Sequence, residues 1–247
     1  MRVRIRFTKL GKVRFTSHRD AARIWERACR RAELPVAYSV GFSPRPRLHF
    51  GLALSTGHES LAEYLDVDLD DARAAAIHVD DLPAALSAML PEGMVAQRAM
   101  VIPPGTPSLQ EAVTACTWRI DVADAAADTV ASSLESFLGA QVVLIERERK
   151  GERSTDDIRP AVLAAVVDGE IDLPDGRPGV RLNVELATVG RSLRPAELVG
   201  ALMPHDLDVR VLRTHQWIDA AGVRREPIPL ATTPVGAGCG ATAGGTP

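Results

Sequence analysis

The chain has 247 residues, of which 46% are hydrophobic and 25% are charged. That length allows one large domain or two small ones, and the composition is typical of a globular protein with a packed core. The first residues, MRVRIRF, lack the apolar core of a secretory signal, and no run approaches the roughly 18 apolar residues of a membrane span. We therefore expect a cytoplasmic protein that has no membrane partner.

Charge is unevenly distributed, although the formal net charge at pH 7 is only -3. Residues 1–50, which we call the basic segment, contain thirteen Lys or Arg and three acidic residues. Residues 51–247 contain sixteen basic and twenty-nine acidic residues. Such segregation makes one end of the chain suited to phosphate groups, whereas the remainder repels them.

The first predicted element is a strand over residues 2–8, in which apolar residues alternate with Arg2, Arg4 and Arg6. A later strand, over residues 62–69, has Tyr64, Asp66 and Asp68 on one face. If these are the first and third strands of a ferredoxin-like sheet, they are neighbours. We therefore favour pairing of the arginines with the aspartates over binding of a ligand by the arginines.

A turn at Gly11 precedes a helix that is expected over residues 18–32, with Ser17 as its N-cap. Lys12 lies close to this helix start, and its ammonium group together with the N-terminal amides can form a phosphate site. His18 is interpreted as an exposed residue or a phosphate contact. It is not assigned a catalytic role, because no carboxylate or nucleophile is tied to it by spacing.

The helix itself is the most informative element of the basic segment. At 100° per residue, its arginines fall within about 120° of one another, and small and apolar residues cover the opposite side. These arginines are Arg19, Arg23, Arg27, Arg30 and Arg31. Like charges one helical turn apart repel, so this arrangement favours a polyanion ligand over a merely solvated face.

The loop after the helix, GFSPRPRLH, contains two prolines that hold its backbone extended. Arg45, Arg47 and His49 are therefore expected to project to one side at alternate positions. Arginine suits phosphate because its planar guanidinium donates two hydrogen bonds at once.

Further elements follow in an order that indicates an α+β fold with two tandem ferredoxin-like (β-α-β-β-α-β) units. The expected strands are 48–54, 62–69, 94–102, 112–122, 141–147, 160–167, 180–188 and 208–218, and the expected helices are 81–90, 124–138 and one that begins at Pro195. We predict units at residues 1–103 and 108–226 and a disordered tail at 227–247. One sheet shared by both units is the alternative.

No catalytic constellation is evident in the sequence. Cys29, Cys116 and Cys239 lie far apart, which argues against a disulfide framework, a zinc site or an iron–sulfur cluster. Cys29 is interpreted as a small core residue of the helix. There is also no P-loop, dinucleotide fingerprint, nucleophile elbow or zinc motif. We therefore expect no cofactor and no metal, and the chain is more simply a binding module than an enzyme.

Two passages of the first 70 residues, KLGKVRFTSHRDAARIWERACRRAELP and YSVGFSPRPRLHFGLALSTGHES, resemble the radical SAM-linked protein family, a bacterial domain of unknown function 2344. The S-H-x-D helix start and the G-F-S-P-x-P loop carry this resemblance. It implies a cytoplasmic accessory protein that works with a separate radical SAM enzyme, since this chain has no three-cysteine cluster of its own.

Three functional hypotheses follow. The leading one is a nonenzymatic module that binds RNA or presents it to a partner, with contacts from Lys12, His18, Arg19, Arg23, Arg27, Arg30, Arg45, Arg47 and His49. The second is an enzyme acting on a phosphorylated small molecule or nucleotide, with His18 or His49 as acid–base groups. The third is a basic surface that docks an acidic protein, such as the radical SAM enzyme itself.

Overall fold

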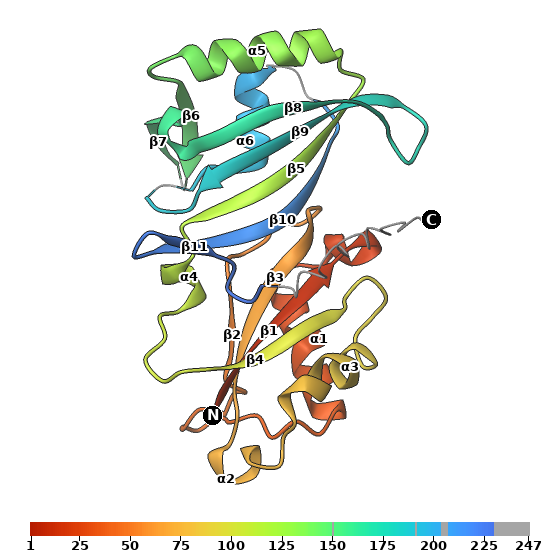
Figure 1. Ribbon diagram of the computed structural model, residues 1–247, viewed down its shortest axis with the longest axis vertical. Coiled ribbons are helices and arrows are strands. Elements are labelled where there is room, and N and C mark those ends of the chain that lie inside the picture. Colours follow the sequence, from red (N-terminus) through yellow and green to blue (C-terminus); the bar gives the residue numbers. More distant parts are fainter. Residues whose placement is uncertain (150, 191, 204–206, 230–247) are drawn as a thin grey trace, which may run out of the picture.

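A single large sheet organises the molecule. The computed structural model describes residues 1–149, 151–190, 192–203 and 207–229. Nine strands form the sheet, in the order β4-β1-β3-β10-β5-β9-β8, with β2 paired to β3 and β11 paired to β10. Figure 1 shows α1 and α3 behind the strands near the N-terminus, and α5 and α6 around the strands at the other end.

The first half of the chain supplies one end of the sheet. Its strands are β1 (Arg2–Lys9), β2 (Leu48–Phe50), β3 (Glu59–Asp68) and β4 (Ala96–Ile102). Its helices are η1 (Gly11–Phe15), α1 (His18–Arg31), α2 (Asp71–Ala74), η2 (Val79–Asp81) and α3 (Leu82–Ser87). Because β1 alternates, its apolar side chains pack against α1 and α3 in one hydrophobic core.

The second half supplies the other end of the sheet and a larger core. Its strands in the main sheet are β5 (Ala115–Ala123), β8 (Val162–Asp172), β9 (Pro178–Ala187), β10 (Val209–Ala220) and β11 (Val223–Arg225). Its helices are α4 (Leu109–Ala112), α5 (Ala127–Gly139), η3 (Arg159–Ala161) and α6 (Pro195–Leu202). A separate two-stranded sheet consists of β6 (Leu144–Arg149) and β7 (Glu152–Asp157).

The two halves meet where β3 pairs with β10. This pairing is parallel and has only two register pairs, Leu212 with Glu59 and Arg213 with Ser60. All other strand pairs in the described part are antiparallel. The α+β class is therefore confirmed as a large, mostly antiparallel sheet with few helices, while the division into tandem ferredoxin-like units stays a prediction.

Local differences from the sequence prediction have identifiable causes. The strand expected at 112–122 begins only at Ala115, and residues 109–112 form a helix before it, because Ser108 and Glu111 make a reciprocal capping box. Residues 141–147 were expected to join the main sheet, but β6 pairs with β7 instead. Ile228 is fully buried, so the beginning of the predicted disordered tail packs on the core. The tail from residue 230 onward lies outside the described residues.

Candidate anion-binding surface

Helix α1 is fixed by local signals at both ends. The Ser17 side chain accepts a hydrogen bond from the Asp20 amide at 3.1 Å, as the N-cap prediction requires. At the other end, the Leu34 amide donates to the Cys29 carbonyl at 3.0 Å, a Schellman-type closure. On the inner face, the Trp25 and Phe7 rings meet edge to face with centroids 4.7 Å apart. These contacts fix which face of α1 points outward.

The outward face of α1 consists largely of arginine, as predicted. We call Arg19, Arg23, Arg27, Arg30 and Arg31 the arginine face, and all five side chains are exposed. Arg23 pairs with Asp20 at 3.3 Å. Within the described part of the chain, the other four arginines have no ion-pair partner. Most of the charge on this face is thus free to meet a ligand.

The loop over residues 37–47, here called the proline loop, closes on itself. The Ser39 amide donates to the Arg45 carbonyl, and the Arg45 amide donates to the Ser39 hydroxyl at 3.0 Å. The Arg45 side chain is exposed. Its guanidinium makes no ion pair with any described residue. Arg45 therefore remains a candidate contact for an anion.

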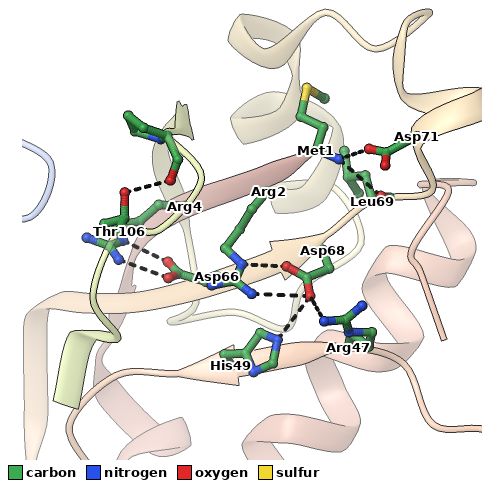
Figure 2. Close-up of polar contacts among 11 residues, drawn as sticks. Met1, Arg2, Arg4, Arg47, His49, Asp66, Asp68, Leu69, Asp71 and Thr106 are labelled. Atoms are coloured by element: carbon green, nitrogen blue, oxygen red, sulfur yellow. Dashed lines mark hydrogen bonds and ion pairs between the residues drawn. The ribbon is translucent and has the colours of Figure 1, made fainter. Parts of the chain in front are cut away.

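Arg47 and His49 project to a common side, but they do not join the arginine face. Both reach the Asp68 carboxylate, Arg47 at 2.9 Å and His49 at 3.3 Å, and Figure 2 shows them converging there with Arg2. Leu48 and Phe50, the alternate residues of β2, pack in the core beneath α1. Arg47 and His49 therefore point to the sheet face opposite α1.

Asp68 neutralises much of this second cluster. Burial raises the pKa of the Asp68 carboxyl, but hydrogen bonds from Arg2 and His49 and the charge of Arg47 outweigh burial and hold the pKa below its ordinary value. Arg2 and Arg47 also line a hollow of about 690 Å³, which Asp70 and Asp71 line as well. The acids make this hollow a weak candidate for a phosphate site.

The first-strand arginines pair with β3 as predicted. Arg4 donates to both Asp66 carboxylate oxygens, at 2.7 and 2.9 Å, and Arg2 donates to Asp68 at 2.5 Å. Arg6 lies opposite Tyr64 and donates to its hydroxyl at 3.1 Å. Arg4 and Arg6 are each only 3% exposed, which the half-buried strand prediction did not anticipate. Arg2 and Arg4 thus form ion pairs across the strands, and Arg6 bonds to a neutral hydroxyl group.

The residues before α1 are only partly available for an anion. Lys12 is exposed in η1. Lys9, by contrast, is buried and donates to the Thr16 carbonyl at 2.9 Å, and burial lowers the pKa of its ammonium group. His18 is exposed and packs edge to face on Phe50 with centroids 5.3 Å apart. No described carboxylate bonds to the His18 ring, so no acid–base pair is assembled there.

Comparison with known proteins decides the family. A family model described as an uncharacterized protein conserved in bacteria (DUF2344) matches residues 2–195. The chain belongs to this family. No curated protein matches it significantly. The DUF2344 match includes residues 2–50 of the basic segment, with α1 and the proline loop, and ends at the first residue of α6.

A buried polar cluster in this DUF2344 protein was missed by the sequence reasoning. Arg213 of β10 is 1% exposed and donates to the Glu63 carboxylate of β3 at 3.1 and 2.6 Å. Its guanidinium also lies over the Trp118 ring, 5.2 Å from the centroid. Burial lowers the pKa of Arg213, but Glu63 and Cys116 outweigh it, so the net shift is upward. The predicted strand over residues 208–218 contains two arginines, Arg210 and Arg213, and its pattern does not indicate which of them is buried.

His58 lies beside this cluster and is held neutral. Burial, with the positive charges of Arg213 and Lys9, lowers the pKa of His58 to about 4. Its Nδ1 is buried and has no hydrogen-bond partner among the described residues. Because the cluster joins β3 to β10, we interpret it as a junction between the halves.

The described residues of this DUF2344 protein form neither a metal cluster nor a membrane-spanning helix. Within the described ranges, no three His, Cys, Asp or Glu side chains lie close enough together to hold a metal ion. No helix in that part is long and apolar enough to cross a membrane. Cys29 is buried in the core, as expected, and burial raises the pKa of its thiol to about 12. Cys239 lies outside the described residues.

Proposed function

We propose that this DUF2344 protein is a nonenzymatic RNA-binding module of the bacterial cytoplasm that presents its RNA to a separate radical SAM enzyme. The observation that carries the proposal is the arginine face of α1, where four exposed arginines have no acidic partner in the described part of the chain. Lys12 before α1, His18 at its first position and Arg45 in the proline loop are exposed and extend the proposed contact area.

The energetics of the arginine face favour a polyanion. Arg19, Arg23, Arg27 and Arg31 follow one another at intervals of four residues, so neighbouring guanidinium groups repel by about a few tenths of a kcal/mol per pair. A row of phosphates reverses this cost, and arginine binds each phosphate with two parallel hydrogen bonds. An RNA backbone supplies such a row, and each neutralised phosphate adds to affinity through counterion release.

The placement of the two candidate histidines favours binding over catalysis. His18 packs against Phe50 beside α1, whereas His49 bonds to Asp68 on the opposite face of the sheet. An enzyme that uses both as an acid–base pair needs them within hydrogen-bond reach of one substrate. We therefore keep Arg47 and His49 outside the principal RNA surface and assign the surface to α1, Lys12 and Arg45.

Charge reversal on α1 tests the proposal. The Arg23→Glu/Arg27→Glu variant and a control variant, Arg153→Glu/Arg225→Glu, change the net charge equally, and all four arginines are exposed. We expect fluorescence anisotropy with a labelled single-stranded RNA of about 20 nucleotides to show roughly 100-fold weaker binding for the α1 variant and a shallower salt dependence. The control is expected to bind within about threefold of the wild type.

Equal RNA affinity of the two charge-reversal variants would overturn the proposal. Loss of binding to a radical SAM protein without any loss of RNA binding would instead identify the arginine face as a protein-docking surface. Circular dichroism of each variant checks that the fold is retained.

A further inference from the structure

A small pocket adjoins the arginine face at the C-terminal end of α1. Tyr38 and Pro46 line it from the proline loop, Arg30 and Glu33 line it from the helix end, and Arg73 lines it from α2. Its volume is about 320 Å³. That is near the lower end of the roughly 300–1,000 Å³ typical of small-ligand pockets, a size that suits one planar ring system. We call it the loop pocket.

Four charged side chains line the loop pocket. Glu26 lines it together with Glu33, Arg30 and Arg73, so two carboxylates and two guanidinium groups surround the same space. None of these four side chains forms an ion pair with any described residue. The pocket therefore offers both hydrogen-bond donors and acceptors to a ligand with a polar edge.

Tyr38 gives the loop pocket an aromatic wall. Its side chain is 54% exposed, and its backbone is held by an antiparallel bridge to Pro46. The Arg47 amide, which donates to the Ala37 carbonyl at 2.9 Å, closes the loop behind it. The ring is thus mounted on a closed loop beside an opening, an arrangement in which a nucleobase can stack on it.

Glu33 occupies a backbone position that glycine fits better. It is the residue just after α1, with φ of 54°, and its amide donates to the Arg30 carbonyl at 3.1 Å as part of the helix closure. A left-handed conformation is unfavourable for a residue with a Cβ, which is why glycine dominates this position. Glu33 nevertheless stands at this position and lines the loop pocket, which makes its carboxylate a candidate contact for a ligand.

We propose that the loop pocket takes one unstacked base of a single-stranded RNA whose backbone lies on the arginine face. This inference rests on the proposed function and narrows its substrate class. Arg30 belongs to both surfaces, so a strand that follows α1 reaches the pocket without a break. Tyr38 stacks on the base, and Arg30 and Arg73 hold the adjoining phosphates.

The carboxylates of the pocket select the kind of base. Glu33 and Glu26 accept hydrogen bonds, so they favour a base that presents an exocyclic amine, such as the N4 amine of cytosine. Uracil presents the O4 carbonyl oxygen at the position of this amine, and that oxygen repels a carboxylate. The pocket is therefore expected to prefer cytosine over uracil.

Affinity for labelled oligo(C), oligo(U) and a double-stranded RNA of equal length tests this inference by anisotropy. The wild type should bind oligo(C) more tightly than oligo(U). Tyr38→Ala should weaken oligo(C) binding about tenfold, the typical value of one stacked base, and leave the duplex unaffected. Phe42→Ala is the matched control, because Phe42 is a fully exposed aromatic of the same loop that does not line the pocket.

Glu33→Gly supplies a second, independent readout. Glycine fits the backbone at this position, so the variant keeps the fold, and it should lose the preference for oligo(C) while the salt dependence of binding is unchanged. Equal losses for Tyr38→Ala and Phe42→Ala, or an unaltered base preference in Glu33→Gly, would overturn the inference. The proposed function would survive that result if charge reversal of α1 still abolishes RNA binding, and it fails if charge reversal has no effect.

Discussion

Individual charged residues show where sequence patterns stop being informative. The alternation in β1 predicts that Arg4 meets Asp66, and the two do form a bidentate pair. It does not predict their burial, because the side chains that cover them come from distant parts of the chain. Arg6 is one example, since the Glu226 carboxylate and the Ile228 carbonyl accept from it at 2.7 and 3.2 Å. Burial is a tertiary property of these residues.

His58 makes stability depend on pH. Its folded-state pKa of about 4 lies below the ordinary value of 6.5, so the unfolded chain binds more protons between these pH values. The free energy of unfolding is therefore constant in this respect above pH 6.5 and falls as the pH decreases towards 4. We expect a loss of roughly 1–2 kcal/mol, reduced by partial solvent screening.

Urea denaturation across this pH range measures the effect of His58. The His58→Asn variant lacks this pH-dependent loss of stability. Its free energy of unfolding should therefore fall less than that of the wild type as the pH decreases. His78→Asn, which removes an exposed histidine, should retain the wild-type slope. Parallel stability curves for the wild type and His58→Asn would show that His58 titrates normally.

At the scale of elements, the sequence predicts best where local chemistry decides. Helix α1 was placed correctly because Ser17 caps its start and the apolar residues recur on one face. β7 was missed because its sequence, ERSTDD, has no apolar alternation and forms by pairing with β6. The proline loop is an intermediate case. The shared side of Arg47 and His49 was predicted, but the closure of the loop on itself and the sheet face to which these two side chains point were not.

The capping contact of α1 yields a prediction at this scale. Ser17→Ala removes the acceptor of the Asp20 amide, and we expect the free energy of unfolding to fall by about 1 kcal/mol. Ser17→Asp keeps an acceptor and should restore most of the loss. Chemical denaturation followed by circular dichroism measures both variants. A stability of Ser17→Ala equal to that of Ser17→Asp would mean that the cap contributes nothing.

At the scale of the whole molecule, the sheet joins two halves whose separate patterns are visible in the sequence but whose junction is not. The backbone contact between β3 and β10 is short, with only two register pairs. Side chains add to it, since Gln216 donates to the Ala62 carbonyl at 2.6 Å and Arg210 contacts Glu59 at 3.4 Å. The candidate site, too, could be predicted from the sequence only in part. Its arginine face follows from helical periodicity, while the loop pocket needs Arg73, which lies far along the chain from α1.

The Arg213–Glu63 pair is expected to couple the unfolding of the two halves. Glu63→Ala leaves the Arg213 guanidinium buried without its carboxylate, which should lower the free energy of unfolding by about 3–5 kcal/mol, whereas Glu63→Leu/Arg213→Met removes both charges and should lower it much less.

Tryptophan fluorescence can follow the two halves separately. Trp25 lies in the core of the first half and Trp118 in that of the second, so a variant that retains only one of these two tryptophans reports on one half. In the wild-type background both reporters should follow one urea transition, because the shared sheet makes unfolding cooperative. In Glu63→Ala the transitions should separate, since the charge left unpaired lies at the junction itself. If they stay coincident and the midpoint is unchanged, the pair does not hold the halves together.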